Sequence, residues 1–159
     1  MINCVNHAYE APRNDGLPRS AIKKWWMFCR QNLEENTLFI AVCDLGIGIP
    51  RSLPIKYPSE IIRRALDFLS PGRRTTDARM IQAAIEIARS RTDRQGRGLG
   101  LHNLKRIIDD AKGGRLYIFS NSGLVRYFER THVRENFRRS ILGTVVVWSI
   151  PLGATDEQN

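Results

Sequence analysis

Two glycine-rich segments carry the clearest chemistry in this sequence. The first, Asp44 to Pro50, reads Asp-Leu-Gly-Ile-Gly-Ile-Pro, and the second, Gly96 to Leu101, reads Gly-Arg-Gly-Leu-Gly-Leu. Glycine lets a backbone approach phosphate groups closely and adopt positive φ angles. Backbone amides in such loops, and at the start of a helix that follows, form a site for anions. The two segments together predict a nucleotide pocket.

Each segment also has a simpler interpretation on its own. Asp44 could be an ordinary cap or turn residue after a strand. Gly96 to Leu101 could be a flexible hinge. A turn residue does not explain the Gly-Ile-Gly-Ile-Pro that follows it. The helix expected directly after Gly98 favours phosphate binding over a hinge.

The elements around these segments are visible in the hydrophobic pattern. Leu38 to Cys43 is a continuous apolar run that predicts a buried strand ending at Asp44. Leu99 to Ala111 has the apolar spacing of an amphipathic helix, which Gly113-Gly114 would end. The sequence therefore places one glycine segment after a strand and the other before a helix.

Further elements follow from the same patterns. Ala21 to Arg30 fits both a helix and a strand, and that alternative stays open. The remaining predictions are the end of a helix at Ile2–Tyr9, helices at Ser59–Leu69 (with Ser59 as N-cap) and Asp77–Ala88, a polar and mobile stretch at Ser90–Gly98, strands at Arg115–Ser120, Gly123–Glu129 and Thr144–Ile150, and a hairpin turn at Asn121–Gly123.

This order of elements predicts an α+β fold, a two-layer sandwich. One mixed, mostly antiparallel sheet would carry helices on one face. Residues 1–152 would form a single domain, and the polar, acidic residues 153–159 a disordered tail.

Composition narrows the class of protein. The chain has 159 residues, 42% of them hydrophobic, which suffices for one core. No apolar run is long enough to span a membrane, and the first residues do not form a signal peptide. The three cysteines, Cys4, Cys29 and Cys43, have no metal-ligand spacing, so we expect a reduced, cytoplasmic protein.

The chain is strongly basic, with a formal net charge of +9. Such a charge suits nucleic acid, a polyphosphate ligand or a solvated arginine-rich surface. The arginines are spread over several segments and are not interleaved with aromatic residues. Nucleic-acid binding is therefore possible but not favoured.

Taken in order, the motifs resemble those of the GHKL ATPase superfamily, whose nucleotide-binding domain is called the Bergerat fold. The four similar blocks are Asn3–Tyr9 (the N-box), Asp44–Pro50 (the G1 box), Gly96–Leu101 (the G2 box) and Gly143–Thr144. The resemblance extends from Asn3 to Pro151. The chain is also similar to a group of uncharacterised bacterial proteins that contain this domain. The His-Ala-Tyr ending of the first block is closest to the anti-sigma-factor kinases of the family.

The resemblance implies ATP and Mg²⁺ as ligands. Asn3 would bind Mg²⁺, a hard cation that prefers oxygen donors, and His7 would lie near the phosphates. Asp44 would accept a hydrogen bond from the adenine amino group. The other implied contacts are Gly46 and Gly48 beneath the base and ribose, Gly96, Gly98, Leu99, Gly100 and Leu101 around the phosphates, and Thr144 at the adenine end.

The resemblance also implies an ATP lid between the two glycine boxes, here Arg51 to Gln95. The arginines that could reach phosphates are Arg73, Arg74, Arg91, Arg94 and Arg97. For any single one of them, a solvated surface arginine is the simpler interpretation.

The sequence departs from the family at its start. The family's catalytic glutamate stands four residues before Asn3, which here falls before Met1, and the preceding strand and helix are missing. We therefore expect an N-terminally truncated domain that is marginally stable or associates through exposed core, with a partner protein or further domain in the parent. His102 and His132 are expected to be surface or structural residues.

Three functions are compatible with these motifs. The leading one is ATP binding, with Mg²⁺-dependent hydrolysis or phosphoryl transfer in the full-length parent. The alternatives are a regulatory module that senses ATP without turnover and an anti-sigma-like serine or histidine protein kinase.

Overall fold

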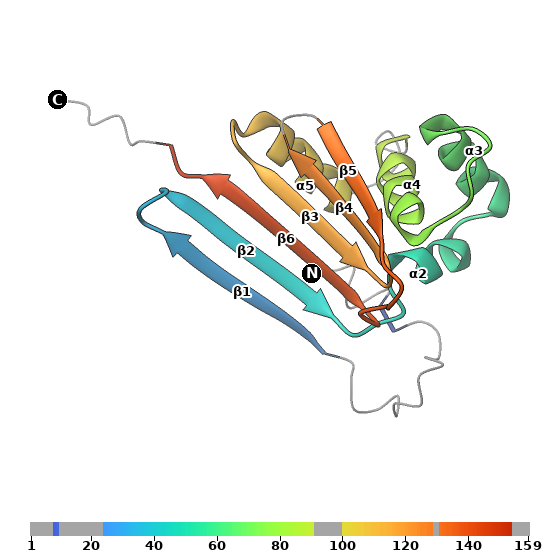
Figure 1. Ribbon diagram of the computed structural model, residues 1–159, viewed down its shortest axis with the longest axis horizontal. Coiled ribbons are helices and arrows are strands. Elements are labelled where there is room, and N and C mark those ends of the chain that lie inside the picture. The colour runs from blue at the N-terminus through green and yellow to red at the C-terminus, as the bar shows by residue number, and fades with distance from the viewer. Residues whose placement is uncertain (1–7, 10–23, 91–99, 129–130, 154–159) are drawn as a thin grey trace.

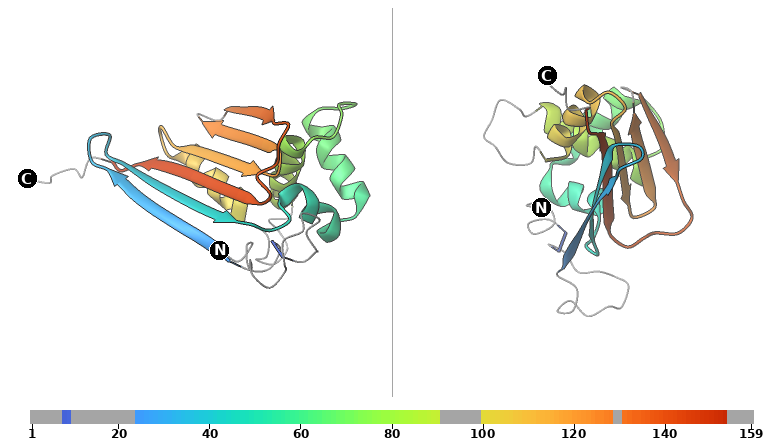
Figure 2. Two further views of the ribbon diagram at one scale, coloured as in Figure 1. Left: turned by 60° about the horizontal axis from the view of Figure 1, so that its bottom comes forward. Right: turned by 90° about the vertical axis from the view of Figure 1, so that its left-hand side faces the viewer.

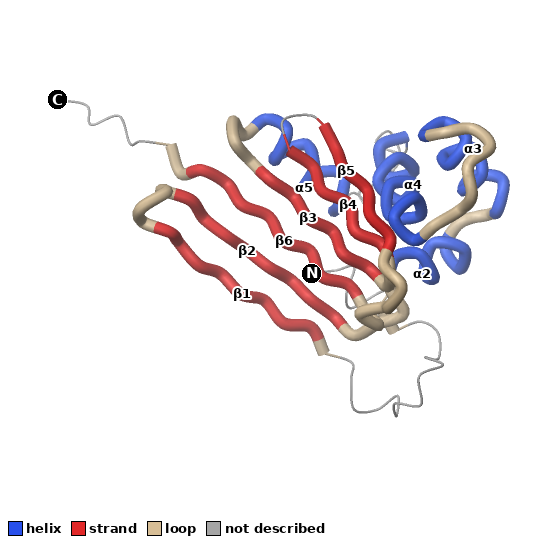
Figure 3. Tube along the Cα trace, in the orientation of Figure 1, coloured by secondary structure: helices blue, strands red, loops and turns tan. Residues whose placement is uncertain are grey.

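The computed structural model describes residues 8–9, 24–90, 100–128 and 131–153. Within them the chain forms one sheet and a group of helices (Figures 1 and 3). The strands are β1 (Trp25–Asn32), β2 (Thr37–Asp44), β3 (Arg115–Ser120), β4 (Gly123–Phe128), β5 (Thr131–Asn136) and β6 (Thr144–Pro151). The helices are α2 (Ile49–Lys56), α3 (Ser59–Leu69), α4 (Asp77–Ser90) and α5 (Gly100–Asp110).

The strands lie in the order β1-β2-β6-β3-β4-β5, so the last strand in the chain lies inside the sheet (Figure 1). All of the strand pairings among the described residues are antiparallel. The expected sheet was mixed and mostly antiparallel; the antiparallel part of that expectation is confirmed.

Helices α4 and α5 pack on one face of β3 to β6, which gives the two layers seen in Figure 2. Burial alternates along β3 and β4, as it must when one face of a sheet meets helices and the other does not. The core between the layers contains Ala78, Ile81, Ile85, Ile108, Leu116, Ile118, Val125 and Tyr127. The α+β class is therefore confirmed.

A second apolar cluster joins α2, α3 and α4, so α4 packs against the sheet on one side and against these helices on another. Its members are Leu53, Ile62, Ala65, Met80, Ala83 and Ile87. Nine of the fourteen residues of α4 are buried. Helix α4 is therefore a core helix, and the ATP lid expected at Arg51–Gln95 stays a prediction.

Several local predictions need correction. Ser59 is the first residue of α3 and not its cap; Pro58 takes the cap position, and the Ser59 hydroxyl donates to Glu60, 3.2 Å away. His132 lies in strand β5, an element that the sequence patterns did not predict. Pro151 is the last residue of β6 and does not lie beyond it.

Other predictions are confirmed or lie outside the described residues. The ambiguous segment Ala21–Arg30 contains the start of strand β1, and the helix at Leu99–Ala111 is confirmed as α5. The polar stretch at 91–99 and the tail at 154–159 lie outside the described residues. None of the helices in the described ranges combines the length and the apolar character needed to cross a bilayer.

Candidate functional site

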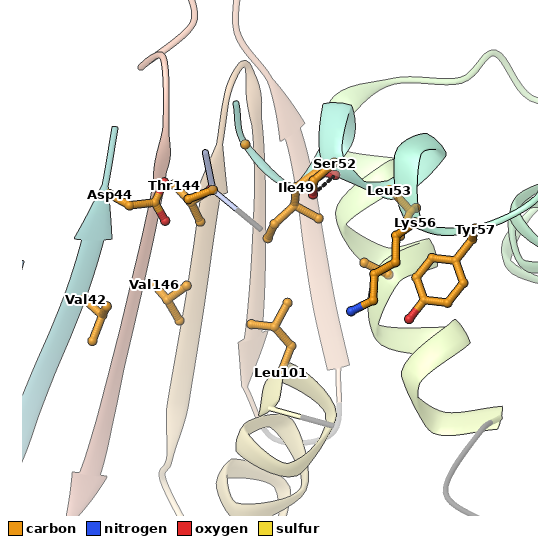
Figure 4. A pocket seen from close by; sticks show the side chains of 13 residues that line it. Val42, Asp44, Ile49, Ser52, Leu53, Lys56, Tyr57, Leu101, Thr144 and Val146 are labelled. Atoms are coloured by element: carbon orange, nitrogen blue, oxygen red, sulfur yellow. Dashed lines mark hydrogen bonds between the residues drawn. The ribbon is translucent and has the colours of Figure 1, made fainter. Parts of the chain in front are cut away.

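A pocket lies between the helix-facing side of β2 and β6 and the helices α2, α4 and α5 (Figure 4). Its hollow measures about 840 Å³ with the solvent-open mouth included. The lining residues are Ala8, Val42, Asp44, Gly48, Ile49, Ser52, Leu53, Lys56, Tyr57, Ala84, Leu101, Thr144 and Val146.

The polar end of the pocket is formed where β2 ends and β6 begins. Asp44 and Thr144 are direct partners in the β2–β6 register and are only 7% and 8% exposed. One carboxylate oxygen of Asp44 accepts the backbone N–H of Gly46 at 2.9 Å. The hydroxyl oxygens of Thr144 and Ser120 lie 2.9 Å apart. A carboxylate and a hydroxyl are thus fixed side by side at one end.

The loop after Asp44 needs its two glycines for close packing. A Cβ at Gly46 would lie 2.1 Å from the carbonyl oxygen of Ala8. Gly48 has a φ of +80°, and a Cβ there would lie 2.6 Å from the side-chain amide of Asn121. The glycines therefore hold this loop against two neighbouring segments, and helix α2 starts directly after it.

Ser120, the last residue of β3, and Asn121, the first residue of the β3–β4 turn, bond to the same loop. No sequence motif predicted either of them as a site residue. The Ser120 hydroxyl accepts the backbone N–H of Ile49 at 2.8 Å. The Asn121 side chain donates to the carbonyl of Ile47 at 3.0 Å. Asn121 has a positive φ angle, in keeping with the hairpin turn predicted at Asn121–Gly123. Nothing in the sequence linked that turn to the first glycine segment.

Helix α2 supplies the far wall of the pocket, which the sequence analysis also missed. Lys56 and Tyr57 lie across the pocket from Asp44, and the lysine ammonium is 5.6 Å from the centre of the Tyr57 ring (Figure 4). This places a positive charge and a phenol hydroxyl opposite a carboxylate. A signal existed in the position of the two residues shortly after the first glycine segment, within the range where the resemblance implied a lid.

The end of the first motif contacts the first glycine segment. The carbonyl of Ala8 accepts the N–H of Ile47 at 2.7 Å. The Tyr9 hydroxyl accepts the N–H of Leu45 at 3.4 Å. Two segments far apart in the sequence are therefore bound together at the pocket.

The second glycine segment reaches the pocket through Leu101, in the first turn of α5. Gly100 is the first residue of that helix. Thus the structure brings together Asp44, Gly48, Leu101 and Thr144 of the expected site, with Gly46 supporting the loop. The other expected site residues, Asn3, His7, Gly96, Gly98 and Leu99, lie outside the described residues.

Of the arginines expected to reach phosphates, the two that the structure describes do not line this pocket. Arg73 and Arg74 line a different hollow beside β5. Arg91, Arg94 and Arg97 lie outside the described residues. In the described part of the chain, Lys56 is the one cationic residue that lines the pocket.

Two histidines lie away from the pocket, as expected for surface or structural residues. Partial burial, with help from Arg106, Arg89 and Lys105, lowers the pKa of His102. The pKa of His132 is lowered by partial burial, then by Arg134 and Lys105. Both imidazoles therefore favour the neutral form.

The described residues do not contain a cluster of metal-ligating side chains. They contain no group of three or more histidine, cysteine, aspartate or glutamate side chains placed to hold an ion. The expected Mg²⁺ ligand, Asn3, is outside them.

No family model matches this chain, and neither does any curated protein or solved structure with which it was compared. Function rests on the geometry of the pocket.

Proposed function

We propose that this chain binds an adenine nucleotide, ATP, in the manner of the GHKL superfamily. One observation carries the proposal. Asp44, Gly48, Leu101 and Thr144 come from three distant parts of the sequence and line one pocket. These are residues that the motif blocks assign to one ligand.

The adenine end of the ligand would lie beside Asp44. A buried carboxylate accepts a hydrogen bond from an exocyclic amino group, and a base without that group leaves the carboxylate unsatisfied. Val42 and Val146 flank this end with apolar surface, which suits the face of a purine. Selection for adenine would come from the carboxylate, and affinity from the apolar walls.

The ribose and phosphates would extend toward α2 and α5. Lys56 places a positive charge on that side, and the amides of Gly96 and Gly98 would add donors for phosphate. Asn3 would hold Mg²⁺, which neutralises phosphate charge when it is bound. The net charge of +9 favours such a polyanionic ligand.

We propose binding, and not turnover, as the function of this chain itself. Asp44 is the one carboxylate among the described lining residues, and the proposal uses it for adenine. Hydrolysis or phosphoryl transfer would need a general base in addition to Asp44. Phosphate release assays and radiolabel transfer to a candidate partner separate an ATPase, a kinase and a non-hydrolysing ATP sensor.

The first prediction tests adenine recognition with Asp44→Asn. The variant keeps the oxygen that accepts the Gly46 N–H but turns half of the carboxylate into a donor, which faces the adenine amino group. We expect calorimetry to show MgATP binding weakened by about 10- to 100-fold, the cost of an unsatisfied buried polar group.

The matched control is Asp67→Asn, which makes the same chemical change on the exposed side of α3. It should leave the dissociation constant for MgATP unchanged. MgGTP should bind more weakly than MgATP to the unaltered protein. Equal affinity of the unaltered protein and the Asp44 variant for MgATP would remove the proposal.

A further inference from the structure

A second hollow lies between the α3–α4 connection and strand β5, and its lining is strongly basic. It measures about 1090 Å³ including its open mouth. The lining residues are Arg73, Arg74, Thr76, Arg79, His132, Val133, Arg134 and Asn136. Four arginines and a histidine meet here, and no carboxylate is among the described lining residues.

Arg79 is the fixed point of this hollow. It is only 5% exposed, and its terminal nitrogens donate to the carbonyl oxygens of Leu66 at 2.8 Å, of Ser70, of Arg74 and of Arg73. Its Nε is buried and has no partner among the described residues. A buried N–H of a cationic group is costly to leave without an acceptor, so this nitrogen indicates a missing one.

The other arginines are also available to an acceptor. Arg73 and Arg74 are exposed, and Arg134 projects from β5 toward the helices with no ion pair in the described part of the chain. The neighbouring carboxylates are used elsewhere. Glu135 points to the opposite face of the sheet and pairs with Arg126, and Asp77 accepts the N–H of Ser122 at 2.9 Å.

We propose that this hollow is a binding site for a phosphate-type dianion. The guanidinium group offers planar, paired donors that match the oxygens of phosphate, and several such groups around one hollow favour a double negative charge. Inorganic phosphate and a phosphorylated side chain share this chemistry.

The site is separate from the pocket proposed for ATP and does not depend on it. The two hollows share no lining residue. They lie at different places along the sheet: one faces β2 and β6, and the other faces the edge strand β5. Asp44→Asn should therefore leave phosphate binding at the second hollow unchanged, which keeps the two tests independent.

The test is a titration with sodium phosphate followed by NMR of the Arg79 Nε–H. A buried, protected Nε–H gives a distinct arginine resonance. We expect this resonance to shift with phosphate in a saturable manner, and not to shift with sodium chloride at matched ionic strength. A shift that never saturates, or one that chloride reproduces, would overturn the proposal.

Charge-matched variants sharpen the test. Arg73→Gln/Arg134→Gln removes two positive charges from the hollow while keeping Arg79, and should weaken phosphate binding by about 10-fold or more. Arg63→Gln/Arg64→Gln removes two charges from exposed positions of α3 that do not line the hollow, and should leave the affinity unchanged. Equal weakening in both variants would mean that phosphate responds to net charge alone.

A final comparison identifies the source of the phosphate group. The probes are a short phosphoserine peptide and its unphosphorylated form. Tighter binding of the phosphopeptide than of inorganic phosphate supports a protein-borne ligand at the site, whereas equal affinity supports the free ion. Equal binding of the two peptides would contradict recognition of the phosphate group.

Discussion

At the scale of single residues, the pocket depends on hydrogen bonds between polar groups beside it. The carbonyl of Gly143 accepts the backbone N–H of Asn121 at 3.0 Å and the Ser120 hydroxyl at 3.3 Å. The Thr144 hydroxyl lies against Ser120. In sequence, Gly143-Thr144 is nearly uninformative, but in the structure this pair connects β6 to the β3–β4 turn that holds the glycine loop.

The histidines predict how stability depends on pH. Because the folded protein lowers the pKa of His102 and His132 below the ordinary 6.5, the unfolded chain binds protons more readily. The free energy of unfolding should therefore decrease as the pH falls through 6.5 toward the lower pKa of the folded state. His102→Gln should reduce this dependence, measured by urea denaturation at about pH 7.5 and about pH 5.5.

His132→Gln should reduce the same dependence, and the double variant should reduce it further. An unchanged difference in unfolding free energy between the two pH values, in His102→Gln and in the double variant, would contradict the assignment.

At the scale of elements, the fold depends on how closely α4 packs on the sheet. Gly123 begins β4, and a Cβ there would lie 2.3 Å from the backbone nitrogen of Ala78 and 2.5 Å from the carbonyl carbon of Asp77. The first turn of α4 is therefore in backbone contact with the sheet. Since Ala84 of the same helix lines the pocket described above, this contact also positions a wall of that pocket.

Gly123→Ala should push the start of α4 away from β4. We expect a loss of about 1–3 kcal/mol in the free energy of unfolding, the usual cost of overpacking. Gly72→Ala is the control: Gly72 has a φ of +69° but nothing within 4 Å of the added Cβ, so only backbone strain of about 1 kcal/mol applies. Urea denaturation of both variants measures the difference. A smaller loss at Gly123 than at Gly72 would contradict the packing argument.

Elements with a strong hydrophobic pattern could be predicted from the sequence, and those without one could not. The apolar run Leu38–Cys43 predicted a strand and lies in β2. The amphipathic spacing of Asp77–Ala88 predicted a helix and lies in α4. Helix α2 was missed because it contains Pro50 and Pro54. Strand β5, with the sequence Thr-His-Val-Arg-Glu-Asn, was missed because its polar residues give no alternation.

The candidate site was predictable where a motif fixes residue type and spacing, and unpredictable where tertiary packing supplies the residue. The first group includes Asp44 and Gly48, with Thr144 added only because it completes the ordered set of blocks. Lys56 and Asn121 belong to the second group, since each reaches the pocket region through an element that no motif connects to it. Arg73 and Arg74, which the resemblance placed near the phosphates, line another hollow, because a motif does not fix the direction of residues that lie between its blocks.

At the scale of the whole molecule, the sheet is covered unevenly. The main helix contacts lie on β3 to β6, whereas β1 is an edge strand and is exposed along most of its length. Trp26, Met27 and Phe28 are 39%, 50% and 62% exposed. An exposed apolar edge strand pairs readily with other chains. Association through this edge strand is a prediction, distinct from the association through exposed core expected from the sequence.

Phe28→Lys should reduce such association, because a lysine on an edge strand opposes pairing with another sheet. Sedimentation velocity over a range of protein concentrations measures it. Phe68→Lys is the control, since Phe68 is 68% exposed but lies on α3, away from the edge strand. The control should associate as the unaltered protein does. Equal behaviour of the two variants would locate association elsewhere.

The position of β6 has a consequence for how this protein is made. β6 follows the other strands in the chain, yet it joins β2 to β3 in the sheet. During synthesis the β1–β2 hairpin and the β3–β4–β5 meander emerge first and have no strand to connect them. Pairings between residues so far apart in the chain form slowly. Asp44 and Thr144 can therefore pair only after β6 has been synthesised, and the polar end of the pocket is completed last.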